Sequence, residues 1–543
     1  MLLRRLTVIL IVAAVTALLG WSLVHALAPG GWTAAKVAMF VSGLISAPWI
    51  GFCAANGSIG FAIRLFRPAT RPPVSFQGVL PPTAIAVAVR NEDMAMVLPP
   101  IQSLLRGLDA AGVGEAFAVF VLSDTGDGAA ARAEEAAVAV FQARENAGRV
   151  RYRRRTENSG FKAGNIMDFM DRHAEGFELV LVLDADSLMT PDAVQHLVLA
   201  MRDDPSLGIV QHLTVGLPAA SAFPRLFQFG MRAGMRTWAA ALAWWQDDSC
   251  VYWGHNAIIR IAPFRTYCRL PLLPDGGHIL SHDQIEAAML RGAGWGIRLL
   301  AEEDGSYEAN PPALPEFTRR ELRWLAGNLE YRHFLRMPGL RPMGRWQLIQ
   351  AILLFGSAPF HLALLLSAAW IAATDRTSPF PFGWALTASV VWMGAVYAPK
   401  LLAYLELLVS GAKRARYGGT ARLLTGIVLE TVFTLLMDAI NTLSKTMETI
   451  RIAIGFKGAW VPQTRGDRGV PWSEAARQFW PHTLLGMGTF ACFAGRGWTP
   501  VVWALPFALG LVLAIPFCVF TAHPSLGLWL RARKLAAIPE ELP

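Results

Sequence analysis

The sequence predicts a mostly parallel α/β domain inserted between two α-helical transmembrane regions. The chain of 543 residues is 54% hydrophobic and only 16% charged, and its mean hydropathy is +0.37, values typical of a membrane protein. The long apolar runs lie at the two ends, whereas residues 67–345 hold most of the charge. In that middle region short apolar strands alternate with helical patterns, an order that implies parallel strands joined by crossover helices.

The N-terminal region, residues 1–66, is expected to hold two membrane helices. Residues 6–28 and about 37–64 are each long enough to span a bilayer. A cleaved signal peptide ending near Ala28 is the alternative, although the apolar run is longer than a typical signal core. Basic residues flank the pair on one side, which predicts that the N-terminus and the central domain are cytoplasmic. These residues are Arg4, Arg5, Arg64 and Arg67, against Lys36 alone in the loop between the spans.

The C-terminal region, residues 346–530, is expected to hold further spans, and residues 531–543 a cytoplasmic tail. Charges interrupt the stretch 420–457, which fits an amphipathic helix lying in the membrane interface. One or two further spans in that stretch are the alternative, so the expected total is six spans, with up to eight allowed. The expected C-terminal spans are about 347–373, 381–408, 482–495 and 499–521.

Within the central domain, polar residues follow the ends of three predicted strands. Strands are expected at 83–89, 117–123, 149–154 and 178–186, with helices through about 108, over 129–145 and over 162–173. Ligands bind at the carboxyl ends of the strands in such sheets. The polar residues at these ends are Asn91, Glu92, Asp124, Asp184 and Asp186. Their convergence predicts a binding site along one edge.

The stretch LVLDADSLMT, residues 181–190, places two carboxylates on one face of a strand end, because residues i and i+2 point the same way. Two like charges repel unless a cation lies between them. Mg²⁺ prefers one or two carboxylates together with phosphate oxygens. The domain contains neither GxGxxG nor GxxxxGK[ST], so we expect a nucleoside diphosphate held through a divalent cation. The alternative is a plain polar strand end with Asp192 capping the next helix.

Three later stretches complete the candidate site: WGHNAIIR (253–260), ILSHDQIEAAMLRGAGW (279–295) and TRRELRWLAGN (318–328). Asp283 opens a predicted helix, where an acidic residue is usually a cap or a partner of the helix dipole. Arg320 and Arg323 share a helix face and could simply pair with Glu316 or Glu321. Trp324 alone would more often belong to a core.

The net charge of +9 leaves several classes of partner open. Arginine clusters such as RYRRR (151–155) and AKRAR (412–416) fit anionic lipid, a phosphorylated ligand or nucleic acid. Because no nucleic-acid motif is present, no nucleic-acid partner is expected. The five cysteines form no CxxC pair, so neither a disulfide framework nor a zinc site is predicted.

Taken in order, these motifs resemble the processive family 2 glycosyltransferases, which carry an Asp after the second strand, KAGN, DxD, TED and QxxRW. The matching residues here are Asp124, Lys162 to Asn165, Asp184 with Asp186, Ser281 to Asp283, and Arg320 to Trp324. SHD replaces TED, and Arg320 replaces the Gln. Both departures resemble the glucans biosynthesis glucosyltransferase H family more closely. So do the stretches FVLSDTGD, VLDADSLM and YWGHNAIIR.

This resemblance implies a GT-A-type domain in a bacterial inner-membrane enzyme that uses UDP-glucose. It implies a linear β-glucan product, with β-1,2 linkage, formed with inversion, as the backbone of osmoregulated periplasmic glucans. In this interpretation Asp283 is the catalytic base, and Asp186 with Asp184 holds Mg²⁺ (or Mn²⁺). The implied donor-binding residues are Asn91, Glu92, Asp124, Lys162, Asp184, Arg320 and Arg323, and the acceptor-binding residues are Trp324, His255 and His282.

The expected partners are UDP-glucose, a glucan acceptor chain and membrane lipid, with a periplasmic glucan-processing protein or an acyl carrier protein conceivable by analogy. Synthesis coupled to export is expected, and residues 457–466 are a candidate gating loop or a plain basic membrane-surface loop. The alternatives are a non-processive glycosyltransferase acting on a lipid or lipid-phosphate acceptor, and a scaffold that senses UDP-glucose.

Overall fold

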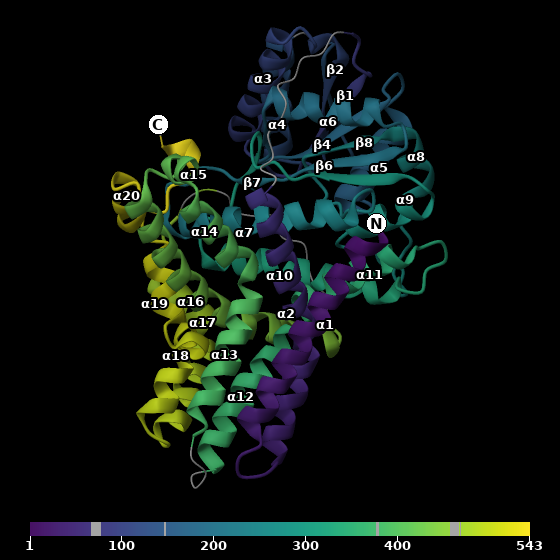
Figure 1. The fold of residues 1–543 in the computed structure, drawn as a ribbon. Coiled ribbons are helices and arrows are strands. Elements are labelled where there is room, and N and C mark those ends of the chain that lie inside the picture. The colour runs from purple at the N-terminus through teal and green to yellow at the C-terminus, as the bar shows by residue number, and fades with distance from the viewer. Residues whose placement is uncertain (67–77, 146–147, 376–379, 457–465, 467, 543) are drawn as a thin grey trace.

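The computed structural model describes residues 1–66, 78–145, 148–375, 380–456, 466 and 468–542. A sheet-containing domain lies at one end of a bundle of long helices, and both chain termini lie toward that end (Figure 1). The candidate gating loop, apart from Gly466, and the expected domain boundary at residue 67 fall outside the described residues.

The domain is built on a seven-stranded sheet with the order β3-β2-β1-β4-β8-β6-β9. Every neighbouring pair is parallel except the two pairs that β8 makes with β4 and β6. The prediction of a mostly parallel α/β fold is therefore confirmed. The strands are β1 (Thr83–Val89), β2 (Phe117–Ser123), β3 (Val150–Arg154), β4 (Leu179–Asp184), β6 (Leu207–His212), β8 (Ala257–Arg260) and β9 (Gly296–Leu300). A second sheet, in the order β5-β10-β7, joins β5 (Leu188–Met189), β10 (Ser306–Glu308) and β7 (Val215–Gly216).

Helices cover both faces of the large sheet because its strands are apolar on both sides. In β1, Ile85 and Val87 pack into one core with α3 and α6, whereas Ala84 and Ala86 face a second core that contains α5, α7 and α9. The helices of the domain are α3 (Met94–Ala110), α4 (Ala129–Glu145), α5 (Phe161–Arg172), α6 (Pro191–Asp203), α7 (Ala222–Gln246), α8 (Ile261–Tyr267), α9 (Asp283–Gly292) and α10 (Leu314–Glu330), with the short turns η1 (Gly114–Ala116) and η2 (Tyr331–His333).

Helix α7 joins the domain to the bundle, since it contacts β7 and β9 as well as α2, α14 and α16. Arg232 and Arg236 of α7 are buried, and both pair with Glu303 in the loop after β9. Arg236 also pairs with the buried Glu406 of α14. Because a buried charge is costly without its partner, these ion pairs fix the domain against the bundle.

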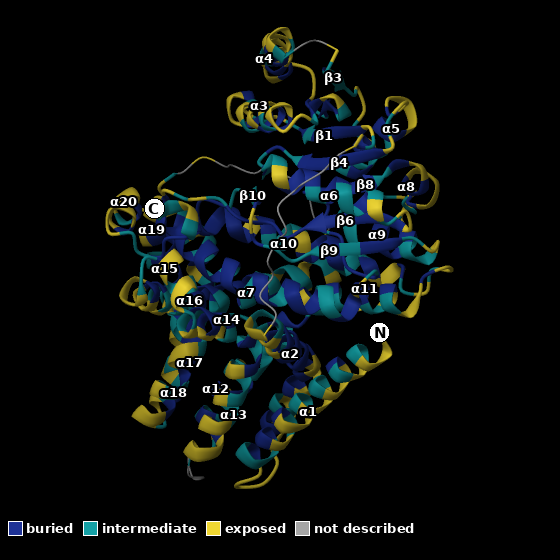
Figure 2. Ribbon diagram, turned by 45° about the horizontal axis from the view of Figure 1, so that its top comes forward, coloured by how far each residue is buried: buried dark blue, intermediate teal, exposed yellow. Residues whose placement is uncertain are grey.

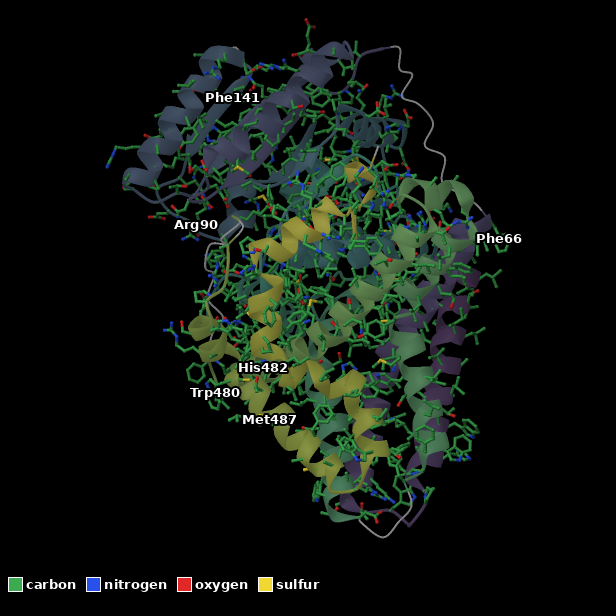
Figure 3. The ribbon with its side chains drawn as sticks, turned by 90° about the vertical axis from the view of Figure 1, so that its left-hand side faces the viewer. Phe66, Arg90, Phe141, Trp480, His482 and Met487 are labelled. Atoms are coloured by element: carbon green, nitrogen blue, oxygen red, sulfur yellow. The ribbon has the colours of Figure 1, made fainter. Side chains whose placement is uncertain are left out.

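Many large apolar side chains of the bundle helices are exposed, as expected where lipid replaces water. Figure 2 shows exposed residues along these helices in yellow. On α17, Trp480 and Met487 are 55% and 56% exposed, whereas His482 is buried and hydrogen-bonds Ser444 of α16 at 2.9 Å (Figure 3). The protein is a membrane protein. The remaining helices are α1 (Leu2–Leu27), α2 (Ala34–Phe66), α11 (Pro342–Gly356), α12 (Ala358–Thr374), α13 (Phe382–Val396), α14 (Ala398–Val409), α15 (Gly411–Arg416), α16 (Thr420–Ala453), α17 (Trp472–Ala494), α18 (Trp498–Val512), α19 (Ala514–Thr521), α20 (Pro524–Ala532) and η3 (Pro539–Glu541).

Within the described residues, four helices or continuous helix pairs are long and apolar enough to cross a membrane: α1, α2, α11 with α12, and α16. The count is six if the bent pairs α13–α14 and α18–α19 each form one span. Helix α16 covers most of the stretch expected at the interface, and its length favours the alternative of a further span. Helix α17, which covers the expected span 482–495, is not among these six. The number of spans and the domain limits stay predictions.

Candidate active site

The carboxyl ends of β1, β2 and β4 meet at one edge of the sheet. Strand β1 pairs in parallel with both neighbours, so that Val89 lies opposite Ser123 and Ala88 lies opposite Asp184. The polar residues that follow these strands are therefore brought together, as the sequence predicts. This edge is the candidate active site.

Asp124 follows β2 and is held by a residue that the sequence analysis did not single out. Arg155, directly after β3, donates to both carboxylate oxygens of Asp124, at 2.7 Å and 2.8 Å. Both side chains are largely enclosed, with exposures of 6% for Asp124 and 10% for Arg155. Arg155 also donates to the carbonyl oxygens of Ser159 and Phe161, both at 3.0 Å. The guanidinium thus connects the end of β2 to the loop that leads into α5.

Asn91 follows β1 in the left-handed conformation, with φ of 56°. Its backbone N–H donates to Oγ1 of Thr125 at 2.8 Å, and that hydroxyl donates to the buried Glu134 at 2.7 Å. Tyr152 of β3 donates to the other oxygen of Glu134 at 2.9 Å. This hydrogen-bond network stabilises the turn that presents the half-buried Glu92 at the same edge.

Lys162 lies in the first turn of α5 and pairs with Asp184 at the end of β4. Its Nζ also donates to the carbonyl oxygen of Gly254 at 2.7 Å. Gly254 has φ of 87° and lies against Asp283, because a Cβ at position 254 would be 3.8 Å from Oδ2 of Asp283. Lys162 and Asp283, distant in sequence, therefore both contact Gly254, and Asp184 joins them through Lys162.

Asp186 lies near a third carboxylate that the sequence did not mark. Glu308 of β10 forms an ion pair of 3.4 Å with Nε2 of His255, and it lies within electrostatic range of Asp186 and Arg320. Burial raises the pKa of Glu308 above its ordinary value, although His255 and Arg320 oppose this. The expected acceptor-binding His255 is thus held by a carboxylate beside the DxD pair.

Asp283 is the first residue of α9, and its Oδ1 accepts hydrogen bonds from Ser281 at 3.2 Å and from Tyr331 at 3.3 Å. The neighbouring His282 bonds through Nδ1 to the buried Glu286 at 2.7 Å. Burial alone would lower the pKa of His282, but the Glu286 carboxylate outweighs burial and raises it. One ring nitrogen of His282 is therefore occupied by Glu286, and the ring belongs to the residue directly before Asp283.

Helix α10 carries Arg320, Arg323 and Trp324. Arg320 is buried, and its guanidinium lies 4.6 Å from the centre of the Trp324 ring. Trp324 is 39% exposed, so it is not a core residue. Glu316 binds Arg468 and Arg319, and Glu321 binds Lys445 of α16. Glu321 also interacts electrostatically with Arg320, as the sequence alternative allows.

The alternative explanations for the acidic residues can be compared with the structure as well. Thr190, whose side chain accepts from the N–H of Ala193, is the N-cap of α6, so Asp192 is not its cap. No side-chain cap bond is formed at the start of α9 within the described residues, so Asp283 is not a cap. Its place in the first turn of α9 agrees with the alternative of a helix-dipole partner.

The residues that sequence reasoning missed are Arg155, Glu308 and Tyr331. Arg155 had a usable signal, since it directly follows a strand in the same way as Asp124. Glu308 and Tyr331 had none, because their partners in the site, His255 and Asp283, are about fifty residues away in the chain.

A divalent cation fits the donor set at this edge. Among the described residues no group of three or more His, Cys, Asp or Glu side chains is arranged to hold a metal on its own. That agrees with a site in which Asp186, with Asp184 beside it, provides one or two carboxylates and the substrate provides phosphate oxygens. Asp184 is 35% exposed on its side chain, so its carboxylate is accessible at the site.

A cavity of about 370 Å³ lies inside the helix bundle. Its lining includes the polar residues Lys36, His361, Asp375, Asp438 and Lys445 and the aromatic residue Trp503. Lys445 also pairs with Glu321 of α10 at 2.8 Å. The cavity lining is therefore connected to the helix that carries the RxxRW residues, which are Arg320, Arg323 and Trp324.

Comparison with known proteins gives consistent matches. The family described as Glycosyl transferase family 2 matches residues 85–268, and Glycosyl transferase family group 2 matches residues 179–401. Glucans biosynthesis glucosyltransferase H of Bradyrhizobium diazoefficiens is 34% identical over 99% of this chain and 74% of its own length. The protein of the same name from Xanthomonas campestris pv. campestris is 32% identical over 99% of this chain and 87% of its own.

Among solved structures, a mannosyltransferase from Pyrobaculum calidifontis in complex with GDP-Man and Mn²⁺ is similar to this chain, with a TM-score of 0.44 and 18% identity. The match covers 69% of this chain and 99% of that one.

Proposed function

The chain belongs to the glucans biosynthesis glucosyltransferase H family, and from that premise we propose that it polymerises glucose from UDP-glucose into a linear β-glucan at the bacterial inner membrane. The donor would bind at the cytoplasmic edge of the sheet, and the β-1,2 linkage is the one that the family suggests. As a member of this family, the protein is a glycosyltransferase with an α/β GT-A-type domain. The donor, linkage, processivity and export belong to the proposal.

One observation carries the proposed mechanism: the predicted base and the predicted diphosphate residues meet at Gly254. Its carbonyl accepts from Lys162, which also pairs with Asp184, and a Cβ added at Gly254 would lie 3.8 Å from Oδ2 of Asp283. A donor held by Lys162 would thus place its anomeric carbon within reach of an acceptor hydroxyl near Asp283.

Each residue has a distinct role in the proposed reaction. Asn91, Glu92 and Asp124 bind the uridine side of the donor, and Lys162, Arg320 and Arg323 bind the diphosphate, for which a guanidinium geometry is well suited. Asp186, with Asp184 beside it, would hold a divalent cation, which when bound would neutralise charge on the departing diphosphate. Trp324, His255 and His282 contact the acceptor chain.

Asp283 accepts the proton of the acceptor hydroxyl as that oxygen attacks the anomeric carbon. The bond from that carbon to the UDP oxygen breaks, and its electron pair leaves with UDP. A single displacement of this kind inverts the configuration of the sugar.

Export coupling is supported by the cavity in the bundle. Its lining is mostly apolar but includes aromatic rings and several polar side chains, which suit a sugar chain, and the Lys445–Glu321 ion pair connects it to α10. In this proposal the growing glucan leaves the site past Trp324 and enters the bundle.

The test uses the purified full chain in lipid nanodiscs with UDP-glucose and Mg²⁺, beside Asp283→Asn. We expect UDP release and a polymer that linkage-specific glucanases degrade, with both lost in Asp283→Asn while UDP binding stays. A positioned base contributes about 10²- to 10⁴-fold, so a variant turning over near the wild-type rate would refute the assigned base. A single sugar on a lipid would establish the non-processive alternative, and binding without turnover in any acceptor mixture would favour the sensor.

A further inference from the structure

The two carboxylate oxygens of Asp283 have different surroundings. Oδ1 accepts two hydrogen bonds, from the hydroxyl of Ser281 at 3.2 Å and from that of Tyr331 at 3.3 Å. Oδ2 lies toward Gly254, where a Cβ would be 3.8 Å away. Because Gly254 also accepts from Lys162, Oδ2 is the oxygen on the side of the donor-binding residues.

Tyr331 is held rigidly. It is fully buried at 0% exposure and packs in a core with Ile285 and Ala288 of α9 and Leu348 of α11. Burial raises the pKa of its hydroxyl well above the ordinary value, and the nearby Asp283 carboxylate raises it further. The hydroxyl therefore keeps its proton at every pH at which the enzyme would work, and it can donate to Asp283 throughout.

The end of α10 positions the whole segment before Asp283. The Glu330 carboxylate accepts from the N–H of Leu280 at 2.8 Å. Gly327 packs directly on Ser281, since a Cβ at position 327 would lie 2.7 Å from the Cβ of Ser281. Tyr331 follows on the next residue after the helix. The helix that carries the RxxRW residues thus also fixes the segment that ends in the predicted base.

We propose that Tyr331 is a positioning residue for the reaction: together with Ser281 it holds Oδ1 of Asp283, so that Oδ2 faces the acceptor hydroxyl and takes its proton. This inference rests on the proposed function, in which Asp283 is the base. A carboxylate free to rotate would present either oxygen in many orientations, and misplacement of a reacting group lowers the rate of a displacement.

The variant Tyr331→Phe removes one hydroxyl and keeps the ring in its core. Hydrogen bonds to charged groups are the stronger class, so we expect kcat to fall about tenfold. The KM for UDP-glucose and the affinity for UDP should stay within about twofold. The hydroxyl of Tyr331 bonds Asp283, which is the proposed base and not a proposed donor-binding residue. The acidic limb of kcat against pH should move to higher pH, since one donor that favours the charged carboxylate is lost.

Tyr417→Phe is the matched control. Tyr417 is buried in the connection between α15 and α16, and its hydroxyl has no hydrogen-bond partner among the described residues. We expect wild-type kcat and a wild-type pH profile for this variant. A second test compares the double variant Tyr331→Phe, Asp283→Asn with Asp283→Asn alone. We expect no further loss of the residual turnover, because the effects of two residues that act through one carboxylate are not additive.

A wild-type kcat and pH profile in Tyr331→Phe, with Asp283→Asn inactive, would overturn this inference and leave the proposed function intact. An active Asp283→Asn would instead overturn the proposed base. If Tyr331→Phe fails to fold, as judged by loss of UDP binding, Ser281→Ala decides, because it removes the other donor to the same oxygen. A wild-type kcat and pH profile in Ser281→Ala would then overturn the inference.

Discussion

Replacement of Arg155 by lysine is expected to weaken UDP binding although the positive charge is kept. Arg155 makes five hydrogen bonds, two of them to Asp124 and the others to the carbonyl oxygens of Ser159 and Phe161 and to the side chain of Asn158. The planar guanidinium reaches these acceptors in several directions at once. A lysine has three donors on a single nitrogen and cannot reproduce the bidentate contact with Asp124.

The magnitude follows from the bonds that lysine cannot keep. At least one bond to the enclosed Asp124 carboxylate is lost, and a hydrogen bond to a charged group contributes about 1.5–3 kcal/mol. If Asp124 and the loop before α5 must be ordered to bind the nucleotide, this loss weakens binding about ten- to a hundredfold. We expect the dissociation constant for UDP to rise by that factor, with a smaller effect on turnover at saturating UDP-glucose.

The assay is calorimetric titration of the full chain in nanodiscs with UDP and Mg²⁺. The neighbouring Arg154→Lys is the control, because Arg154 pairs with Asp127, which is 90% exposed, and with Glu135, which is 44% exposed. Exposed pairs of this kind contribute little. Unchanged UDP affinity in Arg155→Lys, or an equal loss in Arg154→Lys, would refute the reasoning.

Two further predictions concern stability, measured by thermal unfolding in detergent. Glu541→Ala removes the carboxylate partner of Arg225, whose side chain is only 1% exposed; we expect a loss of about 3 kcal/mol, the lower end of what broken buried pairs cost. Asp127→Ala, which breaks an exposed pair, should not shift the melting temperature, and equal shifts in both variants would contradict the burial argument. Burial raises the pKa of Glu330 from 4.5 to about 7, so its contribution to stability is fully present below about pH 4.5 and is lost as the pH rises through about 7. The melting temperature of Glu330→Gln should therefore fall less between pH 5 and pH 8 than that of the wild type, and parallel curves would count against the raised pKa.

Local sequence patterns were sufficient to predict the architecture. Strand residues alternate in direction, which predicted Asp184 and Asp186 on one face of a strand end. In the structure β4 ends at Asp184 and Asp186 lies in the turn that follows, so their shared face stays a prediction. The parallel order of strands then brought Asn91, Asp124 and Asp184 to the same edge, which the register of β1 with its neighbours confirms. These features depend on residues close in the chain, or on the general geometry of parallel sheets, so they could be inferred without a structure.

Membrane topology was predicted less completely. Charged residues within 420–453 suggested an interfacial helix, whereas the structure forms one continuous helix, α16, that packs against α10, α12 and α18. Two of its charges have partners on other elements, as Lys445 pairs with Glu321 and Glu430 pairs with Lys400. A hydropathy profile scores such residues as if lipid surrounded them, because it contains no information on the partners that pack against them.

By itself, the sequence determined the α/β fold class, the apolar ends and the order of the motifs, because these follow from periodicity and composition. Only the tertiary structure decided which side chains hold the candidate catalytic residues. Arg155 on Asp124, Glu308 on His255 and Tyr331 on Asp283 are contacts between segments about thirty to fifty residues apart. Each such contact depends on how helices and strands pack in space, and a packing contact between distant segments leaves no periodic trace in the chain.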